Sequence, residues 1–259
     1  MGRSHRFGAV LRIVDARSRR PVEIAPGRRR PLRIQVHVHR DGAGGELSGL
    51  RVLLVADVLA RTAELYGGQA LVGIAPPGAY GDQWEAFERH AADLGIRPIE
   101  EAPAGPANVQ VTGSSDEYSN AAGGVLVEVG PVHRRDGTSE CDPSAVRLAL
   151  LAHSHHEAAD LTPEGVTDAQ RTLAHWRHAM ADWARSPSKP MCADVLRQAR
   201  TGFEEDLHVP AVLAVLRRLE GESGMPAGAK FETFAHLDRV LGLQLARDVG
   251  SAYPYGPPR

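Results

Sequence analysis

The stretch "RIQVHVHRDGAGGELSGLRVLLVADVLAR" restricts the first half of the chain to a small group of folds. Its opening alternation predicts a strand with Ile34, Val36 and Val38 on one face. A glycine-rich loop follows, and helical periodicity then runs over Leu50–Tyr66 to Gly67, a residue type that commonly ends helices. A strand, a glycine-rich loop and a long helix in this order form the first unit of many nucleotide-binding folds.

Strands and helices go on alternating up to about residue 130. The segments "QALVGIAP", "NVQVTG" and "GGVLVEVG" have the composition of short buried strands. Among them, "DQWEAFERHAADLG" predicts a helix that begins after Asp82 and ends at Gly95. Two further short strands, "GAVLRIVD" and "PVEIAPG", precede this series. The alternation predicts an α/β fold with a parallel sheet.

From Asp142 onward the sequence is helical. Asp142 is the predicted N-cap of the first helix, and Pro143 suits its first turn. The later helices are predicted over "TPEGVTDAQRTLAHWRHAMADWAR", "CADVLRQARTGFEEDL", "VPAVLAVLRRLEG" and "AKFETFAHLDRVLGLQLARDVG". We therefore expect two domains, an α/β domain at residues 1–140 and an all-α helical bundle at residues 141–259.

Composition narrows the class of protein. A formal net charge of −2 over 259 residues gives no overall attraction to nucleic acid or to membranes. The two cysteines, Cys141 and Cys192, lie far apart and in no metal-binding spacing, which favours a reducing compartment without a disulfide framework. The sequence has no signal peptide and no apolar run of about eighteen residues, so we expect a cytoplasmic protein with no membrane partner.

Positive charge is concentrated at the start of the chain. The arginines among the first forty residues are Arg3, Arg6, Arg12, Arg17, Arg19, Arg20, Arg28, Arg29, Arg30, Arg33 and Arg40. Two interpretations stay open at this point. The arginines form either the solvated surface of a hairpin or a surface that binds phosphate groups, for example those of tRNA.

The order of these segments, with their local sequences, resembles that of the cysteinyl-tRNA synthetases and of the related mycothiol-pathway cysteine ligases. The resemblance rests on "LRVLLVADVLARTAELYGGQALVGIAP", with Arg51 and Asp57–Leu59, and on "DPSAVRLALLAHSHHEAADLTPEGVTDAQRTLAHWRHAM". The segment "FEEDLHVPAVLAVLRRL" also resembles the family's "FNTP" helix start. The resemblance as a whole implies a reduced, Rossmann-like class I synthetase core before the helical bundle. The stretch Gly105–Cys141 is much too short for the family, so most of its connective insertion is missing.

The resemblance also implies a chemistry. Class I enzymes activate an amino acid with ATP, chiefly by electrostatic stabilisation at the α-phosphate. The family's first motif, His-x-Gly-His or His-x-Gly-Asn, falls on Glu46–Gly49, so that Glu46 replaces the first histidine and Ser48 replaces the glycine. The start of the helix still offers free N–H groups to an anion. Ser48, Gly49 and Arg51 are therefore candidate nucleotide contacts, with weak binding expected in place of efficient activation.

The family's second motif, Lys-Met-Ser-Lys-Ser, has no counterpart. The expected position carries "PVHRRDGTSEC", and the only lysines of the chain, Lys189 and Lys230, lie elsewhere. His133, Arg134 and Arg135 are candidate phosphate contacts, although arginine does not replace a mobile lysine. The alternative is that they form a solvent-exposed turn.

The amino-acid side of the implied site falls on the first strand. His37 corresponds to the family's first zinc ligand, and Gln35 and His39 share its face. Because the remaining zinc ligands would come from the missing insertion, we expect no zinc there. Gln35, His37, His39 and Glu46 are predicted instead to line a pocket for a nucleotide or small aminoacyl ligand, where doubly wound sheets bind ligands.

Other polar clusters are given ordinary structural roles. His153, His156 and Glu157 have the spacing of one helical face, and we interpret them as charges near a helix end in preference to a metal site. The acidic run 204–206 is predicted to start a helix. Trp176 and Trp183 are expected in the core or at an interface, which would suit a homodimer.

The sequence predicts a divergent cysteinyl-tRNA synthetase-like or mycothiol-ligase-like protein with ATP or AMP as candidate ligands. Whether it is an enzyme stays open, and no residue is predicted to be catalytic or to bind a metal. One alternative is a pseudoenzyme that acts as a binding or regulatory partner. Another is a protein that binds tRNA or aminoacyl-tRNA through the arginine-rich hairpin.

Overall fold

Five parallel strands form the central sheet, in the order β5-β4-β3-β6-β7. The computed structural model describes residues 10–24, 30–38, 45–74, 84–101, 105–113, 123–135 and 141–251. The strands are β3 (Leu32–His37), β4 (Ala70–Ile74), β5 (Glu100–Glu101), β6 (Val109–Thr112) and β7 (Val125–Glu128). Of these five strands, β3 comes first in sequence and is central, β4 and β5 lie on one side of it, and β6 and β7 lie on the other. This is the strand order of doubly wound nucleotide-binding folds, which confirms the predicted α/β class.

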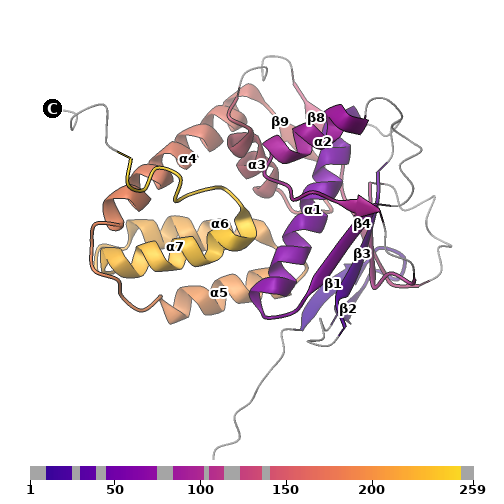
Figure 1. The fold of residues 1–259 in the computed structure, drawn as a ribbon, viewed down its shortest axis with the longest axis horizontal. Helices are drawn as coiled ribbons and strands as arrows, with labels where there is room; N and C mark the ends of the chain where they lie inside the picture. Colours follow the sequence, from indigo (N-terminus) through magenta and orange to yellow (C-terminus); the bar gives the residue numbers. More distant parts are fainter. Residues whose placement is uncertain are drawn as a thin grey trace, which may run out of the picture.

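Helix α1 (Gly45–Leu65) packs against the sheet on one side and against the helical bundle on the other (Figure 1). Fourteen of its residues are buried, so the helix is apolar on nearly every side, as a helix between two layers must be. It begins five residues before the predicted start at Leu50, because the polar first turn of Glu46 to Ser48 hides the helical pattern. Helix α2 (Trp84–Asp93) follows β4 and ends before Gly95, whose φ of 71° is left-handed.

The two N-terminal strands form an antiparallel hairpin, β1 (Leu11–Asp15) with β2 (Arg20–Ile24). The hairpin lies against β7, the edge strand of the sheet. The amide of Ala16 donates to the carbonyl of Leu126 at 2.8 Å, and the Asp15 carboxylate accepts from the amide of Leu126 at 2.9 Å. These bonds satisfy main-chain groups that an open sheet edge would leave unpaired.

The second half is helical, as predicted, with five helices over residues 141–251. They are α3 (Pro143–Leu151), α4 (Pro163–Trp183), α5 (Ala193–Glu204), α6 (Val209–Gly221) and α7 (Ala227–Leu241). Asp142 caps α3 by accepting from the amide of Ser144 at 2.9 Å. Trp176 is completely buried, and both Trp176 and Trp183 pack edge-on against Phe234. The prediction of core tryptophans is confirmed, and the homodimer stays a prediction.

Two short strands were not predicted. β8 (Val132–Arg134) and β9 (Ala159–Leu161) pair in parallel beside α1 and α3. The helical face predicted for His153, His156 and Glu157 is wrong, because α3 ends at Leu151 and a turn leads into β9. Their spacing fits a helix, but the chain changes direction here so that β9 can pair with β8.

The predicted helix start at residues 204–206 is also wrong. Helix α5 ends at Glu204, and Asp206 lies in the loop before α6 with a φ of 55°. The amide of Asp206 donates to the carbonyl of Arg12 at 2.8 Å, and its carboxylate accepts from the amide of Val14 at 2.9 Å. Contacts with β1 therefore fix this loop, and no local pattern in the sequence reveals them.

One hydrophobic core extends across residue 140. It includes Val36 of the sheet, Leu59 of α1 and Leu241 of α7, all essentially buried. The division into two domains at this position therefore stays a prediction. Within the described residues, no helix combines the length and the apolar character that crossing a bilayer requires.

Candidate functional site

A row of polar side chains crosses one face of the sheet. Gln35 of β3 is in register with Gln110 of β6, and His37 is in register with Thr112, which pairs in turn with Glu128 of β7. The intervening residues of these strands, Ile34, Val36, Val109, Val111, Val125 and Val127, are apolar and buried. Since alternate residues of a strand point to opposite faces, the polar row and the apolar row lie on opposite sides of the sheet.

The polar row lies at the topological switch point. β3 is central. The chain adds β4 and β5 on one side of it, and then returns to add β6 and β7 on the other side. Ligands of doubly wound sheets bind at this point, outside the carboxyl ends of the strands. His37 and Thr112 are the last residues of β3 and β6 and therefore lie at the expected place. His39 lies outside the described residues.

Three members of the polar row are buried, whereas Gln35 and Glu128 are partly exposed. Thr112 is inaccessible to solvent, Gln110 is 4 % exposed and His37 is 8 % exposed. The Nε2 group of Gln110 donates to the carbonyl of Gly123 at 2.7 Å, whereas its Oε1 atom has no hydrogen-bond partner in the described part of the protein. Buried polar atoms without a partner are rare in folded proteins, so this oxygen is suited to accept a hydrogen bond from a ligand or a water.

Gln110 and Thr112 were missed in the sequence. The signal was present, because "NVQVTG" has the same alternation of apolar and polar residues as "RIQVHVH". Both strands place their polar residues on the same sheet face. Gln35 and His37 were identified because their strand matches the strand that carries the family's first zinc ligand. The resemblance pointed to no functional residue on β6.

The first turn of α1 carries Glu46, Ser48 and Gly49. The Ser48 hydroxyl accepts a hydrogen bond from the amide of Val132 at 2.9 Å and so fixes β8 beside the start of α1. Gly49 is buried inside the helix. The Glu46 carboxylate is half exposed and contacts Nδ1 of His90 on α2. It stands at the positive end of the helix dipole, the position that would otherwise attract a phosphate group.

Arg51 is buried, with an exposure of 1 %. Its terminal nitrogens donate to the main-chain carbonyls of Gly130 (2.8 Å), Pro131 (3.4 Å), Ser154 (2.8 Å) and Glu157 (2.5 Å). Burial lowers the pKa of Arg51 to about 10, which leaves the group charged at neutral pH. These bonds give the residue a structural role, and the predicted nucleotide contact stays untested.

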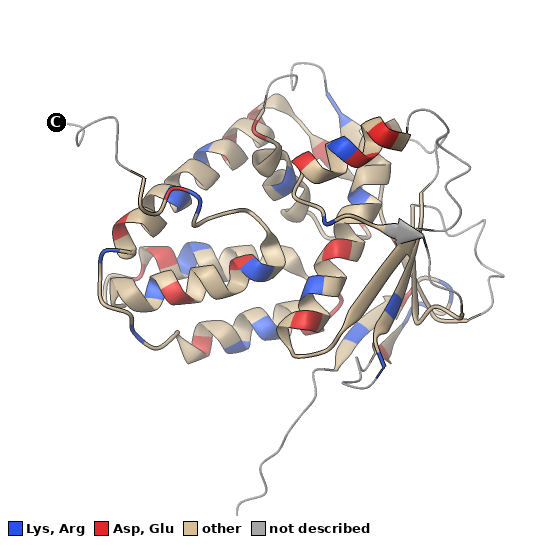
Figure 2. Cartoon of the chain, in the orientation of Figure 1, with Lys and Arg blue, Asp and Glu red and all other residues tan. Residues whose placement is uncertain are grey.

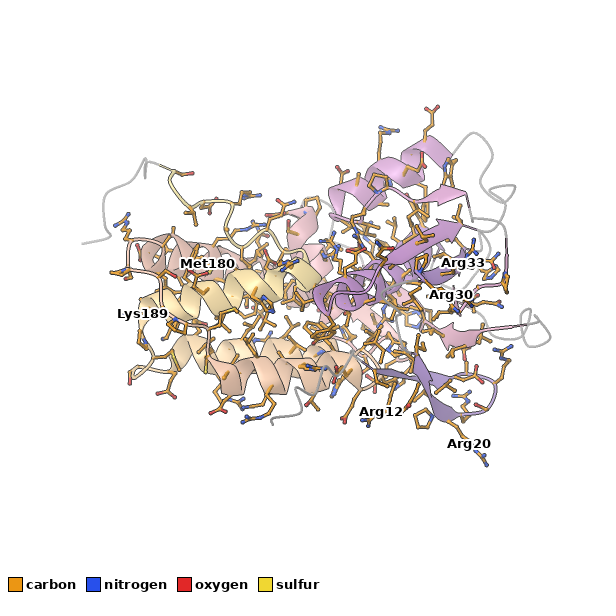
Figure 3. All side chains as sticks on the ribbon, turned by 60° about the horizontal axis from the view of Figure 1, so that its bottom comes forward. Arg12, Arg20, Arg30, Arg33, Met180 and Lys189 are labelled. Carbon is orange, nitrogen blue, oxygen red and sulfur yellow. The ribbon has the colours of Figure 1, made fainter. Side chains whose placement is uncertain are left out.

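The candidate phosphate contacts of the second motif are exposed. His133 and Arg134 belong to β8, and Arg135 follows them. The segment forms a strand that pairs with β9, in place of the turn that was the alternative. Lys189 lies at the far end of the bundle from the sheet (Figure 3), and the Lys230 ammonium donates to the carbonyl of Glu220 at 2.7 Å. Neither lysine therefore lies at the candidate site.

Comparison with known proteins gives relatives for part of the chain, whereas no protein-family model matches it. The chain is 35 % identical over 106 residues to the L-cysteine:1D-myo-inositol 2-amino-2-deoxy-alpha-D-glucopyranoside ligase of Thermobispora bispora. The matched region is 41 % of this chain and 25 % of that ligase. The ligase of the same name from Streptomyces griseus is 30 % identical over 139 residues, 52 % of this chain and 32 % of the ligase. The ligase of this name from Segniliparus rotundus is 38 % identical over 109 residues, which are 40 % of this chain and 25 % of that ligase.

These matches confirm the predicted resemblance to the mycothiol-pathway cysteine ligases. The chain spans only about a quarter to a third of the length of the ligases that it matches. The similarity therefore supports a ligase-like character for the matched region, and the reaction of the full-length ligases is not transferred with it.

Proposed function

We propose that this chain is a divergent cysteine-ligase-like protein that binds a nucleotide or a small aminoacyl ligand at the carboxyl ends of β3 and β6, with impaired or altered amino-acid activation. The observation that carries the proposal is the polar row at the switch point, buried at Gln110, His37 and Thr112, with the Oε1 atom of Gln110 unpaired among the described residues. An amino group or an adenine amine could donate to this oxygen. ATP and AMP are the candidate cofactors.

Weak activation follows from the charges near the start of α1. Adenylation needs positive groups around the α-phosphate as negative charge builds up there. Glu46 places a carboxylate at the helix start, and neither lysine of the chain lies near the sheet. Arg134 and Arg135 remain as candidate phosphate contacts, and both are exposed. A non-catalytic binding or regulatory protein is the alternative that this charge distribution favours.

The zinc ion that cysteinyl-tRNA synthetases use does not fit the residues around His37. Its neighbour in register is the Thr112 hydroxyl, and the two cysteines stand at the starts of α3 and α5. Among the described residues, no set of three His, Cys, Asp or Glu side chains that includes His37 lies close enough to share an ion. We therefore propose no zinc chemistry at this site.

ATP–pyrophosphate exchange over a panel of amino acids tests the proposed function. We expect binding of ATP or AMP by calorimetry, with exchange that is absent or far slower than in a full-length cysteine ligase assayed beside it. Fast exchange with any amino acid would contradict impaired activation. Absence of ATP, AMP and aminoacyl-adenylate analogue binding would contradict the ligand site itself.

Replacing Glu46 with Gln is expected to strengthen ATP binding about 5- to 30-fold, corresponding to ~1–2 kcal/mol. The change removes a negative charge from the positive end of α1 and so removes its repulsion of the triphosphate. Glu85→Gln, in the first turn of α2, is the matched control and should leave the affinity unchanged. An unchanged affinity in Glu46→Gln would place the phosphates away from the start of α1.

The arginine-rich hairpin supports tRNA binding as a second candidate function. Arg12, Arg17, Arg19, Arg20 and Arg30 are exposed on the hairpin and just before β3. Figure 3 shows Arg12, Arg20, Arg30 and Arg33 at the sheet end of the molecule, away from the bundle. Over the bundle, by contrast, acidic and basic residues are interspersed (Figure 2).

We expect the protein to retard unfractionated tRNA in a gel at low salt. The double variant Arg19→Ala/Arg20→Ala should weaken binding and lower the slope of log K against log salt by about 1 per arginine. The exposed bundle residues Arg171 and Arg197, replaced together by Ala, are the control. Equal loss in both double variants, or no retardation by the wild type, would rule out a specific role for the hairpin.

A further inference from the structure

Three potential metal ligands meet where the turn after α3 faces the loop between α5 and α6. The Nε2 atom of His155 lies 3.8 Å from Oδ1 of Asp206, and the Nδ1 atom of His156 lies 3.9 Å from Oδ2 of the same carboxylate. One ligand atom from each of the three side chains lies within 4.8 Å of the other two. His155 and His156 are adjacent in sequence, whereas Asp206 lies about 50 positions further along the chain, so the fold brings the carboxylate to the two imidazoles.

The Asp206 carboxylate is held in position by β1. Its Oδ1 atom accepts from the amide of Val14 at 2.9 Å, while the amide of Asp206 donates to the carbonyl of Arg12 at 2.8 Å. Asp206 and Leu207 both have left-handed backbone conformations, with φ values of 55° and 48°. Aspartate adopts this conformation more readily than most residues, whereas for Leu207 it is uncommon. The loop therefore fixes this carboxylate opposite the two imidazoles.

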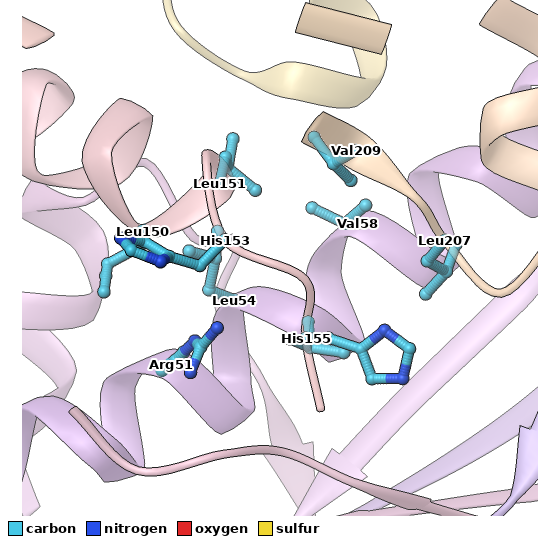
Figure 4. A pocket seen from close by; sticks show the side chains of 10 residues that line it. Arg51, Leu54, Val58, Leu150, Leu151, His153, His155, Leu207 and Val209 are labelled. Carbon is cyan, nitrogen blue, oxygen red and sulfur yellow. The ribbon is translucent and has the colours of Figure 1, made fainter. Parts of the chain in front are cut away.

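His155 supplies the buried ligand of the cluster, because its side chain is only 7 % exposed. The lone pair of a neutral imidazole is available for a metal. Figure 4 shows His155 beside Leu207 at the edge of a cavity of about 20 Å³, which is large enough for about one water molecule.

The opposite side of the cluster is open. The His156 side chain is 58 % exposed, and that of Asp206 is 25 % exposed, so an ion can enter from solvent. Ligand atoms 2.0–2.1 Å from a tetrahedral zinc ion lie roughly 3.3 Å apart, so the ligand atoms, which lie within 4.8 Å of one another, must move together by up to about 1.5 Å to share an ion. Two imidazoles and one carboxylate with a position left for water match the ligand set of Zn²⁺.

We propose that His155, His156 and Asp206 form a binding site for a divalent transition-metal ion, with Zn²⁺ as the ion that fits best. The ion would join the turn after α3 to the α5–α6 loop, and through Asp206 to β1. This site is separate from the polar row on the sheet and does not depend on the function proposed for that row.

Nearby charges set the expected strength of binding. The guanidinium of Arg51 lines the same cavity as His155 and repels a cation, although it is directed at main-chain carbonyls. The Glu157 side chain adds a negative charge that interacts with Arg51. Arg12 and Glu205 form an exposed ion pair beside Asp206 that adds no net charge. The site therefore has one ligand carboxylate to offset the charge of the ion.

The test is a zinc titration of the full chain in competition with a chromophoric chelator. We expect one Zn²⁺ per chain, and a Kd at least tenfold higher in His156→Gln. His178→Gln is the matched control, because His178 is 55 % exposed and faces Asp182 at 3.4 Å, much as His156 faces Asp206. The control should bind zinc as tightly as the wild type.

A second variant guards against a change in the fold. Asp206→Asn keeps an oxygen that can accept from the amide of Val14 but loses the charge, and it should also raise the Kd at least tenfold. With Co²⁺ as the probe, the visible absorption of a tetrahedral site should appear in the wild type and disappear in both variants. Zinc binding that is equal in the wild type, His156→Gln and Asp206→Asn, or absent from the wild type, would overturn the proposal.

Discussion

Replacing Asp57 with Asn is expected to lower the free energy of unfolding by about 3–5 kcal/mol. Asp57 is 3 % exposed in the middle of α1 and contacts three arginines. Its carboxylate lies 2.9 Å from Arg147, 2.8 Å from Arg61 and 3.1 Å from Arg97. Arg147 is completely buried, so the neutral amide would leave a buried guanidinium without its counter-ion. Most domains have only about 5–15 kcal/mol of stability, so the loss would be severe.

The acid dependence of this difference gives a second readout. Burial favours the neutral form of Asp57, but the charges of Arg147 and Arg61 outweigh it and hold its pKa below the ordinary value. A group with a lowered pKa stabilises the fold above its unfolded pKa of about 3.9, and this contribution is lost as the pH falls through the folded value. The difference between wild type and Asp57→Asn should therefore be full at neutral pH and shrink below about pH 4.

Urea denaturation followed by circular dichroism measures both quantities. Asp168→Asn is the control, because Asp168 faces Arg171 at 3.0 Å on the exposed side of α4. An exposed pair of this kind contributes less than about 1 kcal/mol, and its loss should be small. A loss in Asp57→Asn no larger than that in Asp168→Asn would mean that water or rearrangement replaces the lost charge.

The architecture could be predicted because its signals are local. Alternation in "RIQVHVH", the long apolar helix after it and the cap at Asp142 are each set by neighbouring residues. The parallel sheet then follows from the alternation of strands and helices, whereas the order of its strands was not predicted. The boundary of α1 was misplaced because its first turn is polar and begins at Gly45, whose φ of 60° does not fit ordinary helix patterns.

The sites were less predictable because their members are distant in sequence. Gln35 and His37 were identified on β3, but their partners Gln110 and Thr112 required the register of β6. The pairing of Asp206 with His155 depends on hydrogen bonds between the α5–α6 loop and β1, about 190 residues apart. Spacing along the chain instead suggested a helical histidine pattern that the fold does not contain.

Replacing Arg51 with Met is expected to lower the free energy of unfolding by about 4 kcal/mol. Met fills a similar volume but donates no hydrogen bond, and four main-chain carbonyls would lose a charged partner. Two of them, at Ser154 and Glu157, belong to the turn that carries His155, so that turn should lose protection from amide hydrogen exchange. Arg89→Met is the control, because Arg89 is exposed on α2 and its one hydrogen bond, at 3.4 Å, goes to its own helix.

Arg51→Lys separates this structural role from the nucleotide contact that the resemblance implies. Lysine keeps the charge, but its single ammonium group cannot reach all the carbonyls that the two terminal nitrogens of Arg51 contact. We therefore expect a stability between those of the wild type and Arg51→Met. If Arg51 acts only on the main chain, the folded Arg51→Lys protein should bind ATP with the wild-type Kd. A Kd raised tenfold or more, in protein shown by circular dichroism to be folded, would mean that the guanidinium also contacts the nucleotide. Since Arg51 lies more than one helical turn beyond Glu46, the same titration shows how far along α1 the ligand reaches.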